Sequence, residues 1–276
     1  MKLILSRKGF DSSAGGCPSP LLDGRPVSLP IPTRQPSPTT YGDLSNGVAE
    51  LVTDLTKGRI AADHRCHLDP DLDPGSLPRQ PGWRGALGQV STAQTHLANN
   101  SIAPGDLFLF WGLYRAANRN AAGRWQFTGD AEHRIFGWLQ IDEILTIGED
   151  PAPALASRPW LASHPHLATG WSGNNTVYVA RNELSLPGIR TGLAGFGLMK
   201  TGLRLTAHAS HQPSTWKTPA WLNPLNGGTG LTFHPDKRWN PDDTLRSAAR
   251  GQEFIADIGE RADALAWLDS LFNQER

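Results

Sequence analysis

The sequence has few cysteines, no long apolar run and no excess of charge of either sign. Only Cys17 and Cys66 are present among 276 residues, which argues against a disulfide framework and favours a reducing compartment. No apolar stretch approaches the length of a membrane span, and the opening MKLILSRKGF is too short in apolar residues for a signal-peptide core. We therefore expect a cytoplasmic protein with no membrane partner.

The charges are balanced, with 26 Lys plus Arg against 26 Asp plus Glu. Such a chain has no global basic field to attract nucleic acid, so any contact of that kind must be local. The sequence also lacks the GxSxG, HExxH, P-loop, Rossmann-glycine and kinase signatures, which argues against the commonest hydrolase, protease, dehydrogenase and phosphotransfer designs. The 22 prolines and 29 glycines indicate short elements joined by many turns. We expect a single domain over residues 1–276.

Residues 104–145 carry the clearest structural signal. PGDLFLFWGLY and IFGWLQIDEIL predict two apolar strands joined by a polar loop, which together form a β-hairpin rich in aromatic residues, namely Phe108, Phe110, Trp111, Tyr114, Phe136 and Trp138. This order resembles the core hairpin of the PUA, ASCH and EVE group of nucleic-acid-binding barrels. We predict an α+β fold with a curved, mostly antiparallel sheet, a PUA/ASCH/EVE-like barrel core, flanking helices and long loops.

Other segments predict the remaining elements. Apolar spacing and turn residues predict strands at residues 2–6, 174–180 and 203–207. The same reasoning predicts helices over residues 41–57, 87–99, 241–251 and 264–272.

A loop of Gly, Ser and Asp follows the first predicted strand. Lys8, Asp11 and Ser12 place a cation, a carboxylate and a hydroxyl within five positions, and backbone amides of such a loop can point at an anion. The loop is a candidate site, and the alternative is an ordinary capped surface turn.

The segment DHRCHLDPDLDP is rich in residue types that bind metal ions. His64, Cys66 and His67 could bind zinc, although adjacent ligands strain a tetrahedral site. Asp69 and Asp71 alternate in sequence, so in extended chain they would face one side and could hold Mg²⁺. Solvated loop carboxylates are the alternative, since the segment lacks the glycine and terminal glutamate of an EF-hand loop.

Two further groups of polar residues follow. His164 and His166 flank a proline and could serve as metal ligands or as a general acid and base, although the sequence identifies no third ligand. Gln89, Gln94 and His96 lie on the predicted 87–99 helix, where the amides could read the edge of a base. Loop histidines and a solvated helix face are the alternatives.

Several separated motifs occur together in one order: KLILSRKGFDSSAGGCPSP, HLDPDLDP, WRGALGQ, GDLFLFWGLYR, HPH, NNTVYVA and GQEF. In this order the chain is similar to the bacterial family called nucleotide modification associated domain 3. The resemblance implies a role linked to DNA-base modification in phage and bacterial conflict systems, without implying a reaction. It matches motif positions at Lys8, Asp11, Ser12, Asp69, Asp71, Gln89, Gln94, His96, Trp111, Asn175, Gln252 and Glu253.

These residues support two main hypotheses. The first, which we favour, is an enzyme acting on a nucleotide or DNA base, with magnesium as the candidate cofactor. Its catalytic groups would be Asp11, Lys8, Glu253 and His96, and its base- or nucleotide-binding groups Ser12, Gln89, Gln94, Trp111, Asn175 and Gln252. The second is a non-catalytic reader whose aromatic hairpin cages a modified base. A structural partner in a DNA-modification complex is a third alternative.

Overall fold

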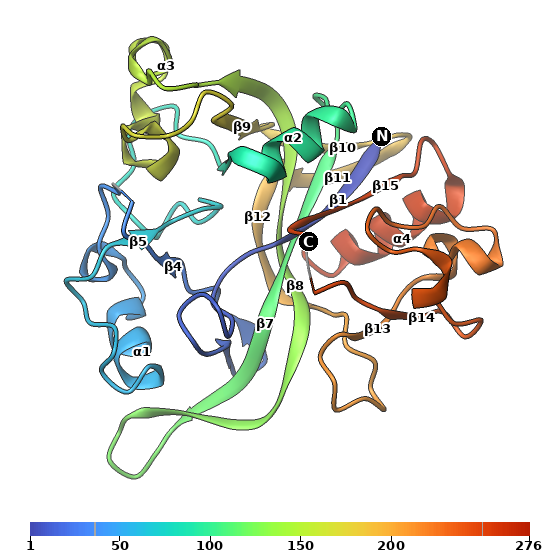
Figure 1. Ribbon diagram of the computed structural model, residues 1–276, viewed down its shortest axis with the longest axis horizontal. Helices are drawn as coiled ribbons and strands as arrows, with labels where there is room; N and C mark the ends of the chain where they lie inside the picture. Colours follow the sequence, from blue (N-terminus) through green and yellow to red (C-terminus); the bar gives the residue numbers. More distant parts are fainter. Residues whose placement is uncertain (36, 250) are drawn as a thin grey trace.

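A mixed β-sheet runs through the centre of the molecule (Figure 1). The computed structural model describes residues 1–35, 37–249 and 251–276. The strand order is β15, β1, β7, β8, β9 and β6, with β12 also paired to β8 and β2 paired to β7 and β3. The strands span β1 Lys2–Arg7, β2 Ser19–Leu22, β3 Arg25–Pro26, β6 Ala86–Gln89, β7 Leu107–Arg119, β8 Trp125–Thr146, β9 Thr176–Ala180, β12 Phe196–Arg204 and β15 Glu253–Asp257.

Strand β1 explains why the sheet is mixed. It runs parallel to β7 and antiparallel to β15, and its residues Leu3, Ile4, Leu5 and Ser6 are all buried. A strand covered on both faces reads as a continuous apolar run, as KLILS does. Strand β2 is also parallel to β7, and the other pairs in this sheet are antiparallel.

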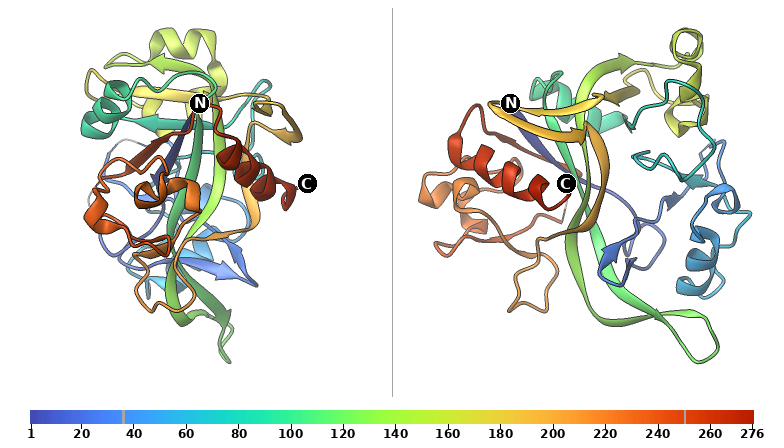
Figure 2. Two further views of the ribbon diagram at one scale, coloured as in Figure 1. Left: turned by 90° about the vertical axis from the view of Figure 1, so that its right-hand side faces the viewer. Right: turned by 180° about the vertical axis from the view of Figure 1, so that it is seen from behind.

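The sheet separates an early part of the chain, after β1, from its last part (Figures 1 and 2). On one side lie α1 (Val48–Leu55), β4 (Ile31–Pro32) and β5 (Cys66–His67), and on the other lie α4 (Ala262–Asn273), β13 (Thr215–Lys217) and β14 (Thr244–Arg246). Helix α4 covers the sheet with an apolar face, and its Phe272 ring packs 5.4 Å from that of Trp138. Two further strands, β10 (Glu183–Leu186) and β11 (Ile189–Ala194), form a separate hairpin.

The aromatic hairpin is confirmed, but it is longer than predicted. The polar residues between the apolar segments continue the β7–β8 pairing as far as Arg119 opposite Trp125, so the turn is only five residues long. The aromatic side chains of its apolar half are buried, and Trp111 is 1% exposed. The large sheet with a few helices confirms the α+β class. The described strands form no closed barrel, so the PUA-like barrel core is not confirmed.

The predicted 87–99 helix is confirmed only from Ser91 onward, and the predicted helix in 241–251 is wrong; strands form in both places. Residues 86–89 form β6, because Leu87 and its neighbours are buried against β9, and helix α2 begins only at Ser91 (Ser91–Asn99). In 241–251, the Asp242 carboxylate accepts hydrogen bonds from the Thr244 backbone N–H (3.1 Å) and hydroxyl (2.7 Å). Such a local turn competes with a helix, and β14 follows it.

The other helices differ from prediction only in length. Helix α1 begins at Val48, because Gly47 takes a left-handed backbone conformation that ends the preceding turn. The predicted closing helix corresponds to α4, and α3 (Ala152–Ser157) is a short additional helix. Short 3₁₀ turns occupy Tyr41–Asp43, Pro159–Ser163, Pro165–Leu167, Ala220–Leu222, Pro224–Asn226 and Asp236–Arg238. Within the described residues, no helix combines the length and apolarity that crossing a membrane requires.

Candidate functional site

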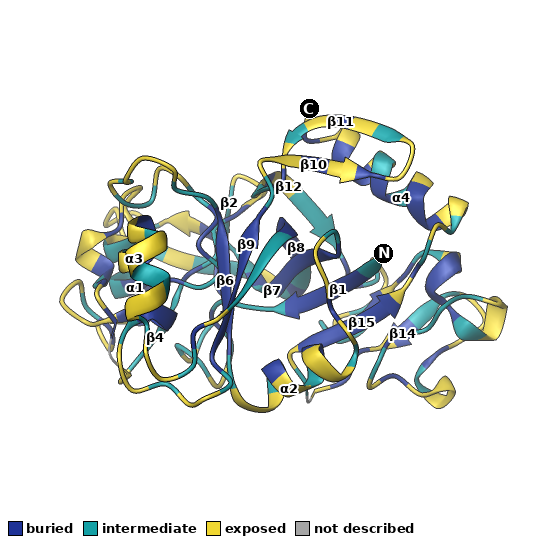
Figure 3. Ribbon diagram, turned by 90° about the horizontal axis from the view of Figure 1, so that it is seen from above, coloured by how far each residue is buried: buried dark blue, intermediate teal, exposed yellow. Residues whose placement is uncertain are grey.

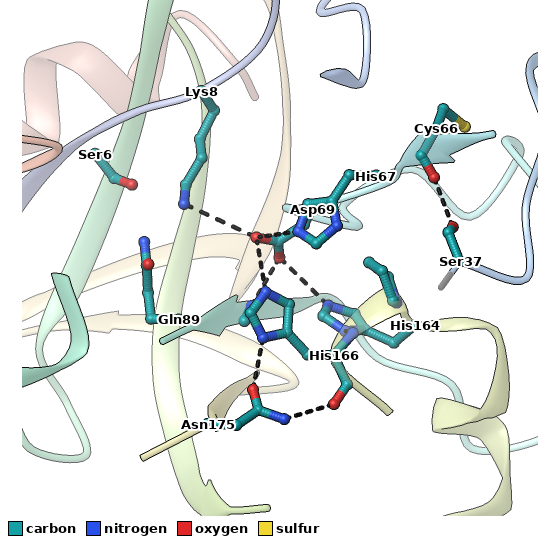
Figure 4. Close-up of polar contacts among 12 residues, drawn as sticks. Ser6, Lys8, Ser37, Cys66, His67, Asp69, Gln89, His164, His166 and Asn175 are labelled. Atoms are coloured by element: carbon teal, nitrogen blue, oxygen red, sulfur yellow. Dashed lines mark hydrogen bonds and ion pairs between the residues drawn. The ribbon is translucent and has the colours of Figure 1, made fainter. Parts of the chain in front are cut away.

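Polar residues from separated parts of the chain converge at the end of β1, on buried elements of the fold (Figures 3 and 4). Lys8 directly follows β1, and its Nζ lies 3.7 Å from Glu253 Oε1 and 3.8 Å from Asp69 Oδ2. Glu253 opens β15, which pairs with β1, and Asp69 lies in the loop after β5. One lysine therefore lies between two buried carboxyl groups.

Glu253 is held on one side only. Its Oε1 accepts hydrogen bonds from the Ser6 hydroxyl (3.0 Å) and from the Gln89 amide at the end of β6. Its Oε2 is buried and has no hydrogen-bond partner among the described residues. Burial raises the pKa of Glu253, and Lys8 only partly offsets this. The group is thus a carboxyl that binds a proton more readily than a solvated glutamate does.

Asp69 has the opposite tendency. Its Oδ1 accepts a hydrogen bond from the Gly88 backbone N–H at 2.7 Å, while Oδ2 faces Lys8 and two histidines. Burial by itself would raise the pKa of Asp69, but the neighbouring Lys8 ammonium holds it below its usual value. Asp69 is therefore a carboxylate, and its neighbour Glu253 is the more basic of the two groups.

Three histidines surround the Asp69 carboxylate (Figure 4). The Nε2 atoms of His67 and His166 lie 3.8 and 4.0 Å from Asp69 Oδ2, and His164 Nε2 lies 3.4 Å from Oδ1. Burial lowers the pKa of His67 to about 3 and that of His166 to about 4, although Asp69 opposes the shift in both. The rings of His67 and His166 are therefore neutral at neutral pH.

Asn175, at the start of β9, orients His166. The Asn175 side chain is fully buried; its Oδ1 lies 2.6 Å from His166 Nδ1, and its Nδ2 donates to the His166 carbonyl oxygen at 2.8 Å. The Trp171 ring stacks on His166 at 4.4 Å, with 5° between the ring planes. The imidazole is thus fixed in plane and in direction.

Within residues 1–35, 37–249 and 251–276, one group of side chains could hold a metal ion: His67, Asp69 and His166. One ligand atom from each lies within 4.8 Å of the others. Asp71, the second carboxylate predicted for magnesium, is placed elsewhere: both its oxygens accept hydrogen bonds from Arg79, at 2.6 and 2.7 Å. The predicted Asp69 and Asp71 pair therefore does not share one open face.

A cavity of about 590 Å³ adjoins the cluster. Asp69 and Gly9, the residue after Lys8, line it, together with apolar side chains that include Leu51, Leu72 and Phe136. Its size falls in the range of small-molecule sites, and its walls combine apolar surface with a few polar groups, as ligand pockets do.

The motifs of this site extend over nearly the whole chain, and so does the match to one family model, which covers residues 2–257. The chain belongs to the family called nucleotide modification associated domain 3. No curated protein and no solved structure matches it. The family's name thus links the chain to nucleotide modification in general, and no relative specifies an activity.

The fold brings together five of the site residues that the sequence predicts, namely Lys8, Asp69, Gln89, Asn175 and Glu253. The others lie apart from the cluster. Asp11 accepts hydrogen bonds from Ser13 and Ala14 within its own turn, Ser12 and Gln252 are exposed, Gln94 accepts a hydrogen bond from Tyr178, His96 contacts Thr232, and Trp111 is in the core.

The sequence indicates these histidines separately and not as one group. It identifies no third ligand for His164 and His166, and it places His67 with His64 and Cys66. The partner of His166 is Asp69, which the cis Asp69–Pro70 segment after β5 carries, nearly a hundred residues earlier in the chain. The spacing His67-Leu68-Asp69 was the available signal, since alternate residues of extended chain face one side.

Proposed function

We propose that the chain is an enzyme that modifies or processes a nucleotide or a DNA base at the cluster around Asp69 and Glu253. The observation that carries the proposal is the convergence of two carboxyl groups of opposite pKa tendency on one lysine, beside a cavity that Asp69 lines. Two neighbouring acids with pKa values shifted apart are typical of acid and base pairs in active sites. That the substrate is a nucleotide or a base is inferred from family membership.

Each group has a role that its surroundings suit. Glu253 acts as the general acid or base, because burial raises its pKa and leaves Oε2 without a partner. The Lys8 ammonium stabilises a phosphate or a developing negative charge, since it lies more than 3.5 Å from both carboxylates and is not fully used by either. Gln89 positions Glu253, and Asn175 positions His166, so neither amide is assigned to base recognition.

The cavity suits a planar ring. Its apolar residues can cover a base that has left the stack, while Asp69 provides a polar wall. In the reader hypothesis, rings of the aromatic hairpin contact the base, but these rings are buried in the core. The centroid of the Trp111 ring, for example, lies 4.8 Å from that of Trp216 and 5.8 Å from that of Phe254. An aromatic cage on the hairpin would require the core to open, so we do not pursue the reader.

A second hollow, which we call the basic groove, supports a polynucleotide substrate. It has a volume of about 1110 Å³ and lies between the end of α1 and the tip of the β7–β8 hairpin. Its walls carry Lys57, Arg59, Arg115 and Arg124. Among the residues described, none of these four has an acidic group within ion-pair distance.

These four cations outnumber the one acidic residue of the hollow, Asp54, so they attract phosphates locally in a chain with no net charge. Helix α1 contributes to the walls of both hollows, through Val48 and Leu51 in the first and through Thr53 and Leu55 in the second. The groove would hold the backbone of a strand whose target base enters the cavity.

The test is a comparison of nucleosides by mass spectrometry. Single- and double-stranded DNA with ordinary or 5-hydroxymethylated pyrimidines, and the free nucleotides, are incubated with the purified chain and with its Glu253→Gln variant. We expect a changed nucleoside or a released base with the native chain and none with Glu253→Gln, while Asp11→Ala, in a surface turn, remains active. Equal turnover by native chain and Glu253→Gln would contradict the assignment, and no change in any substrate would contradict the proposed function.

A further inference from the structure

We propose that His67, Asp69 and His166 bind one divalent transition-metal ion. The inference deepens the proposed function, and it rests on that function only for the chemistry that the ion would serve. It does not use the carboxylate pair that the sequence suggested for magnesium, because Arg79 occupies Asp71. The argument depends on which atoms of the cluster carry lone pairs.

The tautomer of His166 follows from its neighbour. The Asn175 Nδ2 group donates to the His166 carbonyl oxygen at 2.8 Å, which identifies Oδ1 as the atom 2.6 Å from His166 Nδ1. An amide oxygen can only accept, so Nδ1 carries the proton of the neutral ring. The lone pair of His166 is therefore on Nε2, the atom that faces Asp69.

Two acceptors thus face each other in a buried place. His166 Nε2 and Asp69 Oδ2 lie 4.0 Å apart, and both side chains are 3% exposed. The nearest cation, Lys8 Nζ, is 3.8 Å from Oδ2, beyond the distance of a hydrogen bond. Neither atom has a hydrogen-bond donor among the described residues, so two acceptors on largely buried side chains face each other and form a suitable pair of ligands for a cation. A cation between these atoms satisfies both.

His67 completes the group from a third direction. Its Nε2 lies 3.8 Å from Asp69 Oδ2, and the three ligand atoms are all within 4.8 Å of one another. Two ligands on opposite sides of an ion with bonds near 2.1 Å lie about 4.2 Å apart. Side-chain movements well under 1 Å therefore bring all three atoms to bonding distance. No backbone rearrangement is needed.

The surroundings have the form of an outer ligand shell. Asn175 holds the far nitrogen of His166, and the Gly88 backbone N–H holds Asp69 Oδ1, which leaves Oδ2 for the ion. His164 lies on the Oδ1 side: its Nδ1 faces the backbone N–H of His166 at 3.3 Å, so the proton is on Nε2, 3.4 Å from Oδ1. Metal-binding histidines and carboxylates are typically oriented by such partners.

The donor set identifies the class of ion. Two imidazole nitrogens and one carboxylate oxygen suit zinc, iron(II), manganese(II) or cobalt(II), whereas magnesium and calcium prefer oxygen ligands throughout. Three protein ligands leave coordination positions open, so such an ion would supply Lewis acidity or an activated water beside the cavity.

The test measures binding of cobalt(II), which has visible absorption bands in sites of this kind. The full chain is freed of metal with a chelator and titrated with Co²⁺, alone and with excess Mg²⁺. We expect one Co²⁺ per chain, no competition by Mg²⁺, and an affinity reduced about tenfold or more in Asp69→Asn, His166→Gln and His67→Ala. The matched control is His211→Gln, since His211 is an exposed histidine far from the cluster in sequence and also paired with an aspartate.

Circular dichroism establishes which variants fold. His67 is more exposed than His166, so its replacement by alanine leaves a smaller internal void. If the variants of the buried residues unfold, His67→Ala therefore still tests the proposal. The proposal is overturned if the native chain binds no Co²⁺, or if folded His67→Ala binds it as tightly as the native chain does. Nucleoside modification by a chain without Co²⁺ binding would overturn the metal site alone, and Co²⁺ binding without modification would overturn the proposed function alone.

Discussion

Replacement of Lys8 by methionine tests the electrostatics of the cluster directly. Methionine keeps the length and apolar stem of lysine but removes the charge that lies 3.7 and 3.8 Å from two carboxyl groups. At these distances each attraction is about 4 kcal/mol with an effective dielectric constant of 20, before the cost of desolvating the lysine is subtracted. Breaking a buried pair by removing one partner costs about 3–5 kcal/mol. We expect the free energy of unfolding to fall by about that amount at neutral pH.

The loss has a definite pH dependence. Without Lys8, the folded-state pKa of Glu253 rises further and that of Asp69 is no longer held down. A carboxyl group whose folded pKa lies above its unfolded value contributes stability at low pH and loses it as the pH rises through the folded pKa. The difference between native and variant is therefore largest at neutral pH and shrinks as the pH falls.

Urea unfolding followed by circular dichroism, at about pH 7.5 and about pH 5, measures both effects. Lys57→Met is the matched control: Lys57 is exposed, and its removal should change the free energy of unfolding by less than about 0.5 kcal/mol at either pH. A loss below about 1 kcal/mol for Lys8→Met, or a loss that does not shrink in acid, would refute the reasoning.

Three further predictions follow from the same contacts. Gly88→Ala should abolish modification and Co²⁺ binding, because a Cβ there would lie 2.1 Å from the His166 ring, whereas Gly173→Ala, whose Cβ meets nothing closer than 4.0 Å, should retain both; equal behaviour of the two would count against the site. The double variant Arg59→Gln/Arg124→Gln should weaken binding of single-stranded DNA and reduce its salt slope by about 1.4, measured by fluorescence anisotropy; an unchanged slope would exclude the basic groove. Trp111→Ala should cost about 3–5 kcal/mol in urea unfolding, while Trp111→Phe keeps DNA affinity, and a loss of affinity in folded Trp111→Phe would revive the reader.

The local elements were largely predictable because their signals are local. The apolar runs around β1 and β7, the turn signal before β9 and the apolar face of α4 each indicate one element, and each element formed. The errors came where tertiary contacts decided between alternatives. Residues 86–89 form a strand because they pair with β9, and the polar half of the hairpin continues the β7–β8 pairing beyond a second irregularity between Arg115 and Ala117.

The sequence by itself nominated Lys8, Asp69, Gln89, Asn175 and Glu253 as site residues, through polar residue types at the ends of predicted elements and through family motifs. It could not assign their partners. Whether an aromatic ring binds a base or fills the core depends on burial, and Trp111 proved to be core.

Only the tertiary structure decided that His67, Asp69 and His166 form one group and that Lys8 lies between two acids. The physical reason is that these contacts join segments up to about 250 residues apart. The return of β15 beside β1 brings Glu253 to Lys8, and the pairing of β6 with β9 brings Gly88, which binds Asp69, near Asn175, which binds His166. The side-chain pattern within any one segment records which face is buried, but not which distant segment buries it.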